Sequence, residues 1–190
     1  MLLNSKLLNL YLAQHAELYG SELSLYSNEN DIYNCPRCKG NLSSDLVFIG
    51  QELISNKDSG IMDESKKLFE KILSSISISI DDVFTTNFLK IFVDKKENKI
   101  EEILKCKKHF EFKLSFKKPK LIISLGQNTS NYLLNNKLLL DDMRNKSFKY
   151  KNIDLMITYS PYSLIKNVNL KKNCWEDFKM IKNILVNYNG

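Results

Sequence analysis

The stretch Lys118-Pro119-Lys120-Leu121-Ile122-Ile123-Ser124-Leu125-Gly126 decides the fold class of this chain. A polar Lys-Pro-Lys lead-in is followed by five residues, four of them aliphatic, and a glycine closes the run. A short apolar run that ends in glycine is typical of a strand buried on both faces of a parallel sheet. The stretch therefore predicts a buried strand over 119–126.

Three other segments repeat this pattern, and stretches with helical spacing separate them. The predicted strands are 45–50, 82–87, 119–126 and 153–159. The predicted helices between and after them are 63–74, 97–116, 127–135 and 175–186. Strands that alternate with helices predict an α/β fold, a three-layer α/β/α sandwich with a central four-stranded parallel sheet.

No internal repeat or low-complexity linker divides the 190 residues. We therefore expect a single domain over 1–190, with an N-terminal helix over 2–18 and a cysteine knuckle over 33–40. Parallel sheets bind ligands where their strands end. Function is therefore expected in the segments 50–60, 87–90, 126–130 and 159–167.

Charge is distributed unevenly along the chain, whose net charge is +6. Residues 1–89 carry 7 basic and 12 acidic side chains, residues 90–120 carry 11 and 5, and residues 144–182 carry 9 and 3. A basic middle and C-terminal part favours a nucleic-acid partner, and a lysine-rich solvated surface is the alternative. The sequence shows neither a membrane-spanning run nor a signal peptide, so we expect a cytoplasmic protein.

Four cysteines are present, at positions 35, 38, 106 and 174. In a reducing compartment such cysteines are metal ligands or buried thiols more often than disulfides. The knuckle Cys35-Pro36-Arg37-Cys38 has the spacing of a metal site, and a metal-free loop is the alternative.

Several short motifs together resemble the uracil-DNA glycosylase superfamily, and most closely its iron–sulfur class. The Pro-Lys-aliphatic strand ending in Leu125-Gly126 resembles that family's "P-K…L-G" strand. The other matching motifs are Cys35-x-x-Cys38, Phe48-Ile49-Gly50, Thr85-Thr86-Asn87, Glu101 to Cys106, Thr158 to Lys166 and Trp175-Glu176-Asp177-Phe178. This resemblance covers about residues 33–186 and implies an enzyme that hydrolyses the N-glycosidic bond of uracil in DNA.

The resemblance assigns substrate-binding roles to residues after the strands. Asn87 would read the edge of the uracil base, since an amide both donates and accepts hydrogen bonds. Gly50 would belong to the first catalytic turn. The segment from Ser160 to Leu164, with Pro161, Tyr162 and Ser163, would form the loop that enters the DNA, and Lys166 would contact phosphate. For Asn87 the alternative is a plain strand end, and for the Ser160 segment a plain turn.

The catalytic motifs depart from the family pattern. Gln51 stands where the family has an acid; it can hold a water but cannot act as a general base, so Glu52 or Asp58 would supply the carboxylate. Ser160 stands where the family has histidine, and it offers one hydrogen bond without a positive charge. Solvated loop acids are the alternative for Glu52 and Asp58.

The metal set departs too. The family's third cysteine position is occupied by Ile91, which leaves Cys35, Cys38 and Cys106, with Cys174 as the candidate replacement. Such a set would suit an iron–sulfur cluster or zinc, and no metal is the alternative. Two functions therefore stay open: a DNA repair glycosylase acting on uracil-containing or single-stranded DNA, and a catalytically degenerate DNA- or protein-binding module. We expect a monomer in either case.

Overall fold

The computed structural model describes residues 38–41, 43–50, 60–87, 110–111, 114 and 118–189. The chain divides into two compact units, Met1–Cys35 and Pro36–Gly190, and every described residue belongs to the second. The predicted helix over 2–18 lies outside the described residues, as does most of the predicted helix over 97–116. The single-domain expectation stays a prediction.

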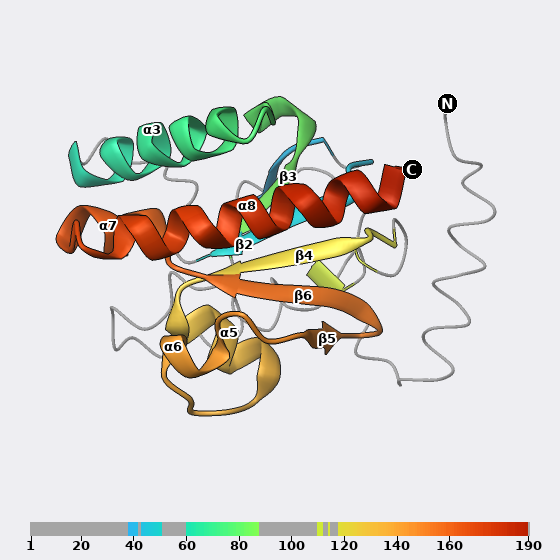
Figure 1. Cartoon of the computed structure of the whole chain (residues 1–190). Helices are drawn as coiled ribbons and strands as arrows, with labels where there is room; N and C mark the ends of the chain where they lie inside the picture. Colours follow the sequence, from blue (N-terminus) through green and yellow to red (C-terminus); the bar gives the residue numbers. More distant parts are fainter. Residues whose placement is uncertain are drawn as a thin grey trace, which may run out of the picture. The chain divides into compact units, whose positions relative to one another are not determined.

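Six strands of the described part form one sheet, in the order β1-β3-β2-β4-β6-β5 (Figure 1). Their bounds are β1 Cys38–Gly40, β2 Leu46–Gly50, β3 Phe84–Asn87, β4 Leu121–Leu125, β5 Phe148–Tyr150 and β6 Ile153–Thr158. The four central strands β3, β2, β4 and β6 are parallel, and these are the four predicted strands. The predicted size of the sheet was wrong, because the short antiparallel strands β1 and β5 extend its two edges.

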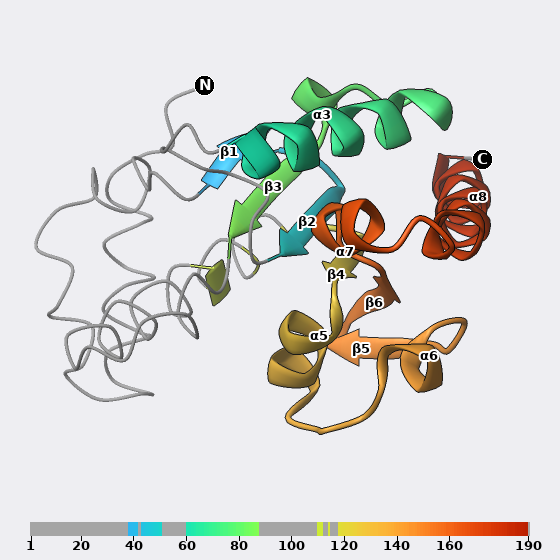
Figure 2. The ribbon, with the colours of Figure 1, turned by 90° about the vertical axis from the view of Figure 1, so that its left-hand side faces the viewer.

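Helices cover both faces of the sheet, which confirms the predicted α/β sandwich. Helices α3 (Gly60–Ser75), α7 (Pro161–Lys166) and α8 (Leu170–Asn189) lie on one side, and α5 (Gln127–Leu134) lies on the other (Figure 2). Two further turns are η2 (Ile80–Asp82) and α6 (Leu140–Met143). No described helix is long and apolar enough to cross a membrane.

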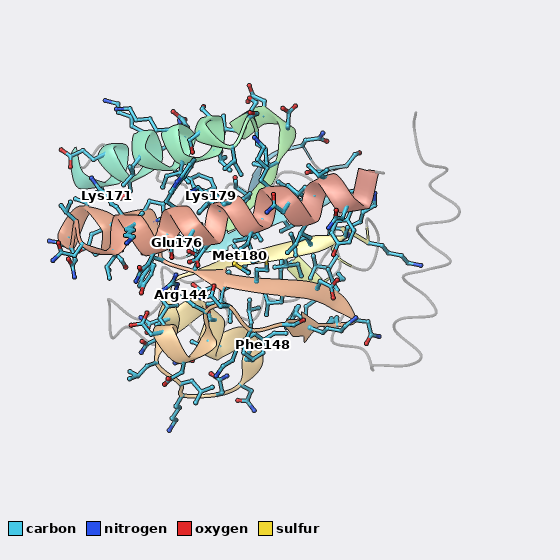
Figure 3. All side chains as sticks on the ribbon, viewed as in Figure 1. Arg144, Phe148, Lys171, Glu176, Lys179 and Met180 are labelled. Carbon is cyan, nitrogen blue, oxygen red and sulfur yellow. The ribbon has the colours of Figure 1, made fainter. Side chains whose placement is uncertain are left out.

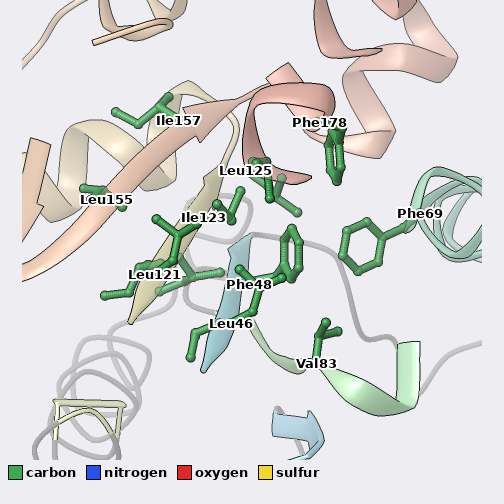
Figure 4. Close-up of a cluster of buried hydrophobic side chains, with 14 of the residues drawn as sticks. Leu46, Phe48, Phe69, Val83, Leu121, Ile123, Leu125, Leu155, Ile157 and Phe178 are labelled. Atoms are coloured by element: carbon green, nitrogen blue, oxygen red, sulfur yellow. The ribbon is translucent and has the colours of Figure 1, made fainter. Parts of the chain in front are cut away.

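The core on the α3–α8 side is built around Phe48 of β2, which is fully buried (Figure 4). Its ring meets Phe69 of α3 edge to face, with centroids 5.0 Å apart, and stacks on Phe178 of α8 at 6.1 Å. Both geometries are favourable for aromatic rings. The alternate residues of β4 serve the other face, where the Ser124 hydroxyl lies 2.9 Å from that of Ser130 in α5.

Candidate functional site

The four parallel strands end in one row of paired residues. Asn87 of β3 pairs with Gly50 of β2, Gly50 pairs with Leu125 of β4, and Leu125 pairs with Thr158 of β6. Because the strands are parallel, the segments that leave them emerge from one edge of the sheet. The structure therefore brings the predicted site positions Gly50 and Asn87 to the same edge as the residues after β4 and β6.

Two of the predicted catalytic segments cannot be placed at this edge. Gln51, Glu52 and Asp58 lie outside the described residues, although the strand before them ends at Gly50. The backbone of Asn87 is described and its side chain is not. The roles assigned to these four residues stay predictions.

Gly126 and Ser160 meet at the edge. The Gly126 N–H donates to the carbonyl of Thr158 at 2.8 Å, which continues the pairing of β4 with β6 beyond the strand ends. Gly126 has φ 92° and ψ 156°, a conformation that side-chain-bearing residues rarely adopt. A Cβ at this position would lie 3.4 Å from the Cβ of Ser160. The turn after β4 therefore needs glycine for its backbone and lies against Ser160.

Ser160 begins helix α7. Its hydroxyl oxygen accepts from the backbone N–H of Ser163 at 3.1 Å and also lies 2.8 Å from the Ser163 hydroxyl. Pro161 follows at the first helical position, where its missing N–H costs nothing. The prediction of a loop over 160–164 was therefore wrong, because the serine cap and the proline together start a helix.

Helix α7 changes which side chain can reach a DNA groove. Leu164 is 1 % exposed and belongs to the core, whereas Tyr162 is 36 % exposed. The Lys166 amine lies 5.5 Å from the centre of the Tyr162 ring. Of the segment assigned to DNA entry, Tyr162 and Lys166 are thus the side chains that face solvent, and Leu164 is not.

A buried ion pair holds the start of this segment in place. The guanidinium of Arg144 donates to both carboxylate oxygens of Asp177, from Nε at 2.9 Å and from Nη2 at 2.7 Å. The Thr158 hydroxyl donates to the same carboxylate at 2.5 Å. Arg144 is 8 % exposed and Asp177 2 %, so both charges are almost fully removed from water. Two-point geometry with further donors is what makes a buried pair favourable.

The same guanidinium reaches Tyr159, the residue between Thr158 and Ser160. Arg144 lies 4.8 Å from the centre of the Tyr159 ring, and the Tyr159 hydroxyl donates to the carboxylate of Asp141. Burial and this hydrogen bond raise the pKa of Tyr159. The sequence analysis found Asp177 through its motif but missed Arg144 and Asp141, since nothing in the spacing links them to the end of β6.

The described cysteines do not lie together. Cys38 starts β1, at one edge of the sheet, and pairs with Thr86 of β3. Cys174 is buried in α8, with its sulfur 3.8 Å from the Thr158 hydroxyl of β6. Since β6 is four strands away from β1 and neighbouring strands are separated by about 4.8 Å, the two cysteines are about 19 Å apart. Ligands of one metal site lie within a few ångströms of each other.

Cys174 is therefore not the fourth ligand of a site that contains Cys38, and the proposed four-cysteine set does not fit a cluster or zinc. Burial raises the pKa of the Cys174 thiol to about 11, which suits a buried thiol. Cys35, Cys106 and Ile91 lie outside the described residues. Within the part of the chain that is described, no three histidine, cysteine or acidic side chains are grouped to hold a metal.

Comparison with known families gives a match to the sequence pattern of the uracil DNA glycosylase superfamily over residues 39–179. This span contains most of the described strands and helices and more than half of the chain. The chain belongs to the uracil DNA glycosylase superfamily. The family resemblance expected from the motifs is thereby confirmed.

Relatives of the superfamily member described here include several archaeal proteins. It is 25 % identical to a type-4 uracil-DNA glycosylase of Sulfurisphaera tokodaii over 188 residues, which cover 86 % of each chain. It is 25 % identical to the type-4 enzyme of Saccharolobus solfataricus over 181 residues, 82 % of this chain and 84 % of the other. An uncharacterized protein of Borreliella burgdorferi is 39 % identical over 72 residues, 38 % of this chain and 35 % of its own.

Proposed function

We propose that this superfamily member hydrolyses the N-glycosidic bond of uracil in DNA. Its similarity to type-4 uracil-DNA glycosylases over most of the chain supports this activity. The observation that carries the proposal is the row Asn87-Gly50-Leu125-Thr158, because it gathers the family's site segments at one sheet edge. Chemistry on a base needs such a pocket edge, since the base must leave the helix stack.

In the proposed mechanism, Asn87 recognises the flipped uracil through its amide. Gln51 orients the attacking water, and Glu52 or Asp58 accepts its proton. The water adds to the sugar carbon as the bond to the uracil nitrogen breaks, and the base leaves as an anion. Tyr162 and Lys166, which face solvent on α7, would contact the DNA on either side of the lesion.

Ser160 has a defined capacity to assist the leaving base. Its oxygen already accepts from the Ser163 N–H, so only its own O–H is available as a donor. That O–H is free for the uracil anion only when Ser163 is the donor between the two hydroxyls. Ser163, which the sequence assigned to substrate binding, would then act by orienting the Ser160 proton.

A second candidate function is DNA binding without hydrolysis. It is favoured by the capping role of Ser160, because the hydroxyl at the family's histidine position stabilises α7 and carries no charge. Loss of one donor to a developing anion costs about 2.7–4 kcal/mol of transition-state stabilisation in other enzymes. The two candidates therefore differ in rate rather than in architecture.

One assay separates them. Purified protein in excess is incubated with single- and double-stranded oligonucleotides that carry one uracil, and alkali then cleaves at abasic sites. Under the first candidate, wild type produces strand breaks, Asn87→Ala produces far fewer, and Asn187→Ala on the exposed end of α8 matches wild type. Absence of breaks with wild type, together with retained DNA binding, selects the second candidate.

A metal site formed by Cys35, Cys38 and Cys106 stays part of this proposal, with either an iron–sulfur cluster or zinc as its occupant. The structure gives no geometry for it, so no step of the mechanism uses it. Metal analysis and visible absorbance of the purified protein distinguish the two occupants. Cys38→Ser is expected to lose the metal, whereas Cys174→Ser retains it. Cytoplasmic location, a monomeric state and a protein partner also stay predictions.

A further inference from the structure

One side of helix α8 is basic and exposed. We define the α8 lysine face by five exposed residues: Lys171, Lys172, Trp175, Lys179 and Lys182. With about 3.6 residues per turn, these five fall within about 100° of the helix circumference, and Trp175 lies near the middle. Glu176 and Met180 occupy the adjacent side. Figure 3 shows this division, with Lys171 and Lys179 along one border of α8 and Glu176 and Met180 along the other.

The aromatic ring of this face is open to solvent. Trp175 is 39 % exposed, and the Lys179 amine lies 5.1 Å from the centre of its ring. The pair is separated by one helical turn, as Tyr162 and Lys166 are in α7. A large exposed aromatic ring flanked by cations is costly to leave in water and is suited to stacking with a planar group beside a negative charge.

The charges around this ring are nearly all of one sign. Residues 161–182 contain five lysines and two acids, and one of the acids, Asp177, is buried in its ion pair with Arg144. Glu176 is the remaining acid. The ion pairs found among the described residues involve none of these five lysines. The face therefore presents uncompensated positive charge to a partner.

We propose that the α8 lysine face binds single-stranded DNA, with phosphates on the lysines and an unpaired base stacked on Trp175. Lysines recognise the phosphates of any strand, whereas the exposed indole selects an unpaired base. The face starts beside the candidate site, because Asp177 of the same helical turn accepts from Thr158 at the end of β6. The choice of DNA as the polyanion rests on the proposed function.

The test uses the fluorescence of Trp175, which is the single tryptophan of the chain. The full-length protein is titrated with a uracil-free single-stranded oligonucleotide, and both tryptophan emission and the anisotropy of a labelled strand are followed. Stacking on Trp175 should quench the emission in step with binding. A duplex of the same sequence should bind with weaker quenching, since its bases are paired. Binding without quenching by the single strand overturns the proposal.

Variants test the two kinds of contact separately. Lys171→Gln/Lys172→Gln should reduce the slope of log affinity against log salt by about 1.4, at about 0.7 per phosphate contact on a single strand. The control Lys118→Gln/Lys120→Gln, which removes the same charge before β4, should leave the slope unchanged. Trp175→Ala should weaken binding by a factor between about 5 and 100, and Trp175→Phe should restore most of it. Equal slopes for the two lysine pairs overturn the proposal.

Two further comparisons settle alternative outcomes. If polyglutamate binds and quenches as well as the oligonucleotide, an acidic protein is the partner and the proposal fails. Circular dichroism and thermal melting establish that each variant is folded. Because the oligonucleotide contains no uracil, a negative cleavage assay leaves this binding result intact. Loss of binding by Trp175→Ala with unchanged cleavage of a short uracil substrate likewise separates the face from the catalytic edge.

Discussion

Arg144 and Asp177 form a buried two-point ion pair between the turn after α6 and the middle of α8, with N–O distances of 2.9 and 2.7 Å. The carboxylate also accepts from Thr158, and the guanidinium donates to the carbonyl of Asn173 at 3.0 Å. The pair thus joins the last parallel strand to the helix that covers it. The peptide carrying Tyr159 and Ser160 leaves directly from this junction.

Asp177→Asn is expected to destabilise the protein strongly. The hydrogen bond with Asp177 raises the pKa of Arg144, so the guanidinium stays charged and would be left buried without a counter-charge. Removing one partner of a buried pair typically costs about 3–5 kcal/mol. Urea denaturation of both proteins measures the loss in free energy of unfolding.

The matched control is Asp45→Asn, which breaks the pair of Asp45 with Lys120 at 2.9 Å. Both partners of that pair are at least 40 % exposed, so the expected loss is below about 1 kcal/mol. Equal losses in the two variants would contradict the structural role assigned to Asp177.

Gly126→Ala should destabilise the protein by about 1–3 kcal/mol through backbone strain alone. Gly40 has the same φ of 92°, but a Cβ there would lie 2.1 Å from the carbonyl oxygen of Val83. Gly40→Ala should therefore cost more than Gly126→Ala, because a backbone clash is added to the strain. Thermal melting compares the two, and the reverse order would show that the turn after β4 is more tightly packed than described.

Ser160→Ala should reduce the free energy of unfolding by about 1 kcal/mol, because helix α7 loses its N-cap. Ser163→Ala removes the neighbouring hydroxyl but keeps the capping bond, which uses the backbone N–H of Ser163. It should therefore cost less. Denaturant titration of both variants measures the difference, and a larger loss for Ser163→Ala would exclude Ser160 as the cap.

Cys174 should resist alkylation in the native protein. Burial raises the pKa of its thiol to about 11, so at pH 8 only about one thiol in a thousand is the reactive thiolate. Iodoacetamide treatment at this pH, followed by peptide mass spectrometry, should leave Cys174 unmodified until urea is added. Rapid native labelling would mean that the start of α8 opens readily.

The contact between Tyr188 and Asp154 should give a pH-dependent contribution to stability. The Tyr188 hydroxyl donates to the Asp154 carboxylate at 2.8 Å, and Lys149 lies 3.3 Å from it; the hydrogen bond is the main cause of a lowered pKa of Asp154. A lowered carboxyl pKa stabilises above the unfolded value, near 3.9, and this stabilisation is lost as the pH falls through the folded value. Tyr188→Phe should therefore be less stable than wild type near neutral pH.

The stability difference between these two proteins should shrink in acid, as Asp154 is protonated in both. Urea denaturation across a pH series measures it. Tyr162→Phe is the matched control, because Tyr162 is an exposed tyrosine of α7 whose described contact is with Lys166. A difference for Tyr188→Phe that does not vary with pH would contradict the link to Asp154.

The sequence was sufficient for the central part of the fold. The four parallel strands and the helices after β2, β4 and β6 were predictable because each strand is an apolar run buried on both faces, as the fully buried pattern of Leu121–Leu125 shows. The edge strands β1 and β5 were not predictable, because three residues such as Phe148-Lys149-Tyr150 carry too little periodicity.

The site was predictable only where a motif marked it. Gly50 and Asn87 were identified by resemblance, and the strand register places them side by side. The partnership of Arg144 with Asp177 depends on a tertiary contact between positions 33 residues apart, and no local pattern signals it. Helix α7 was missed because a Ser-Pro pair is compatible with both a turn and a helix start.

The stacking of Phe178 on Phe48 has a consequence for the order of events during synthesis. Phe48 emerges from the ribosome early, while its stacking partner lies in the last helix of the chain. The hydrophobic face of β2, β4 and β6 therefore stays uncovered until translation ends, which is when exposed strands are most prone to misassociation. The nascent chain should depend on chaperones up to its final residues, and premature termination before Leu170 should yield aggregates rather than a shorter folded protein.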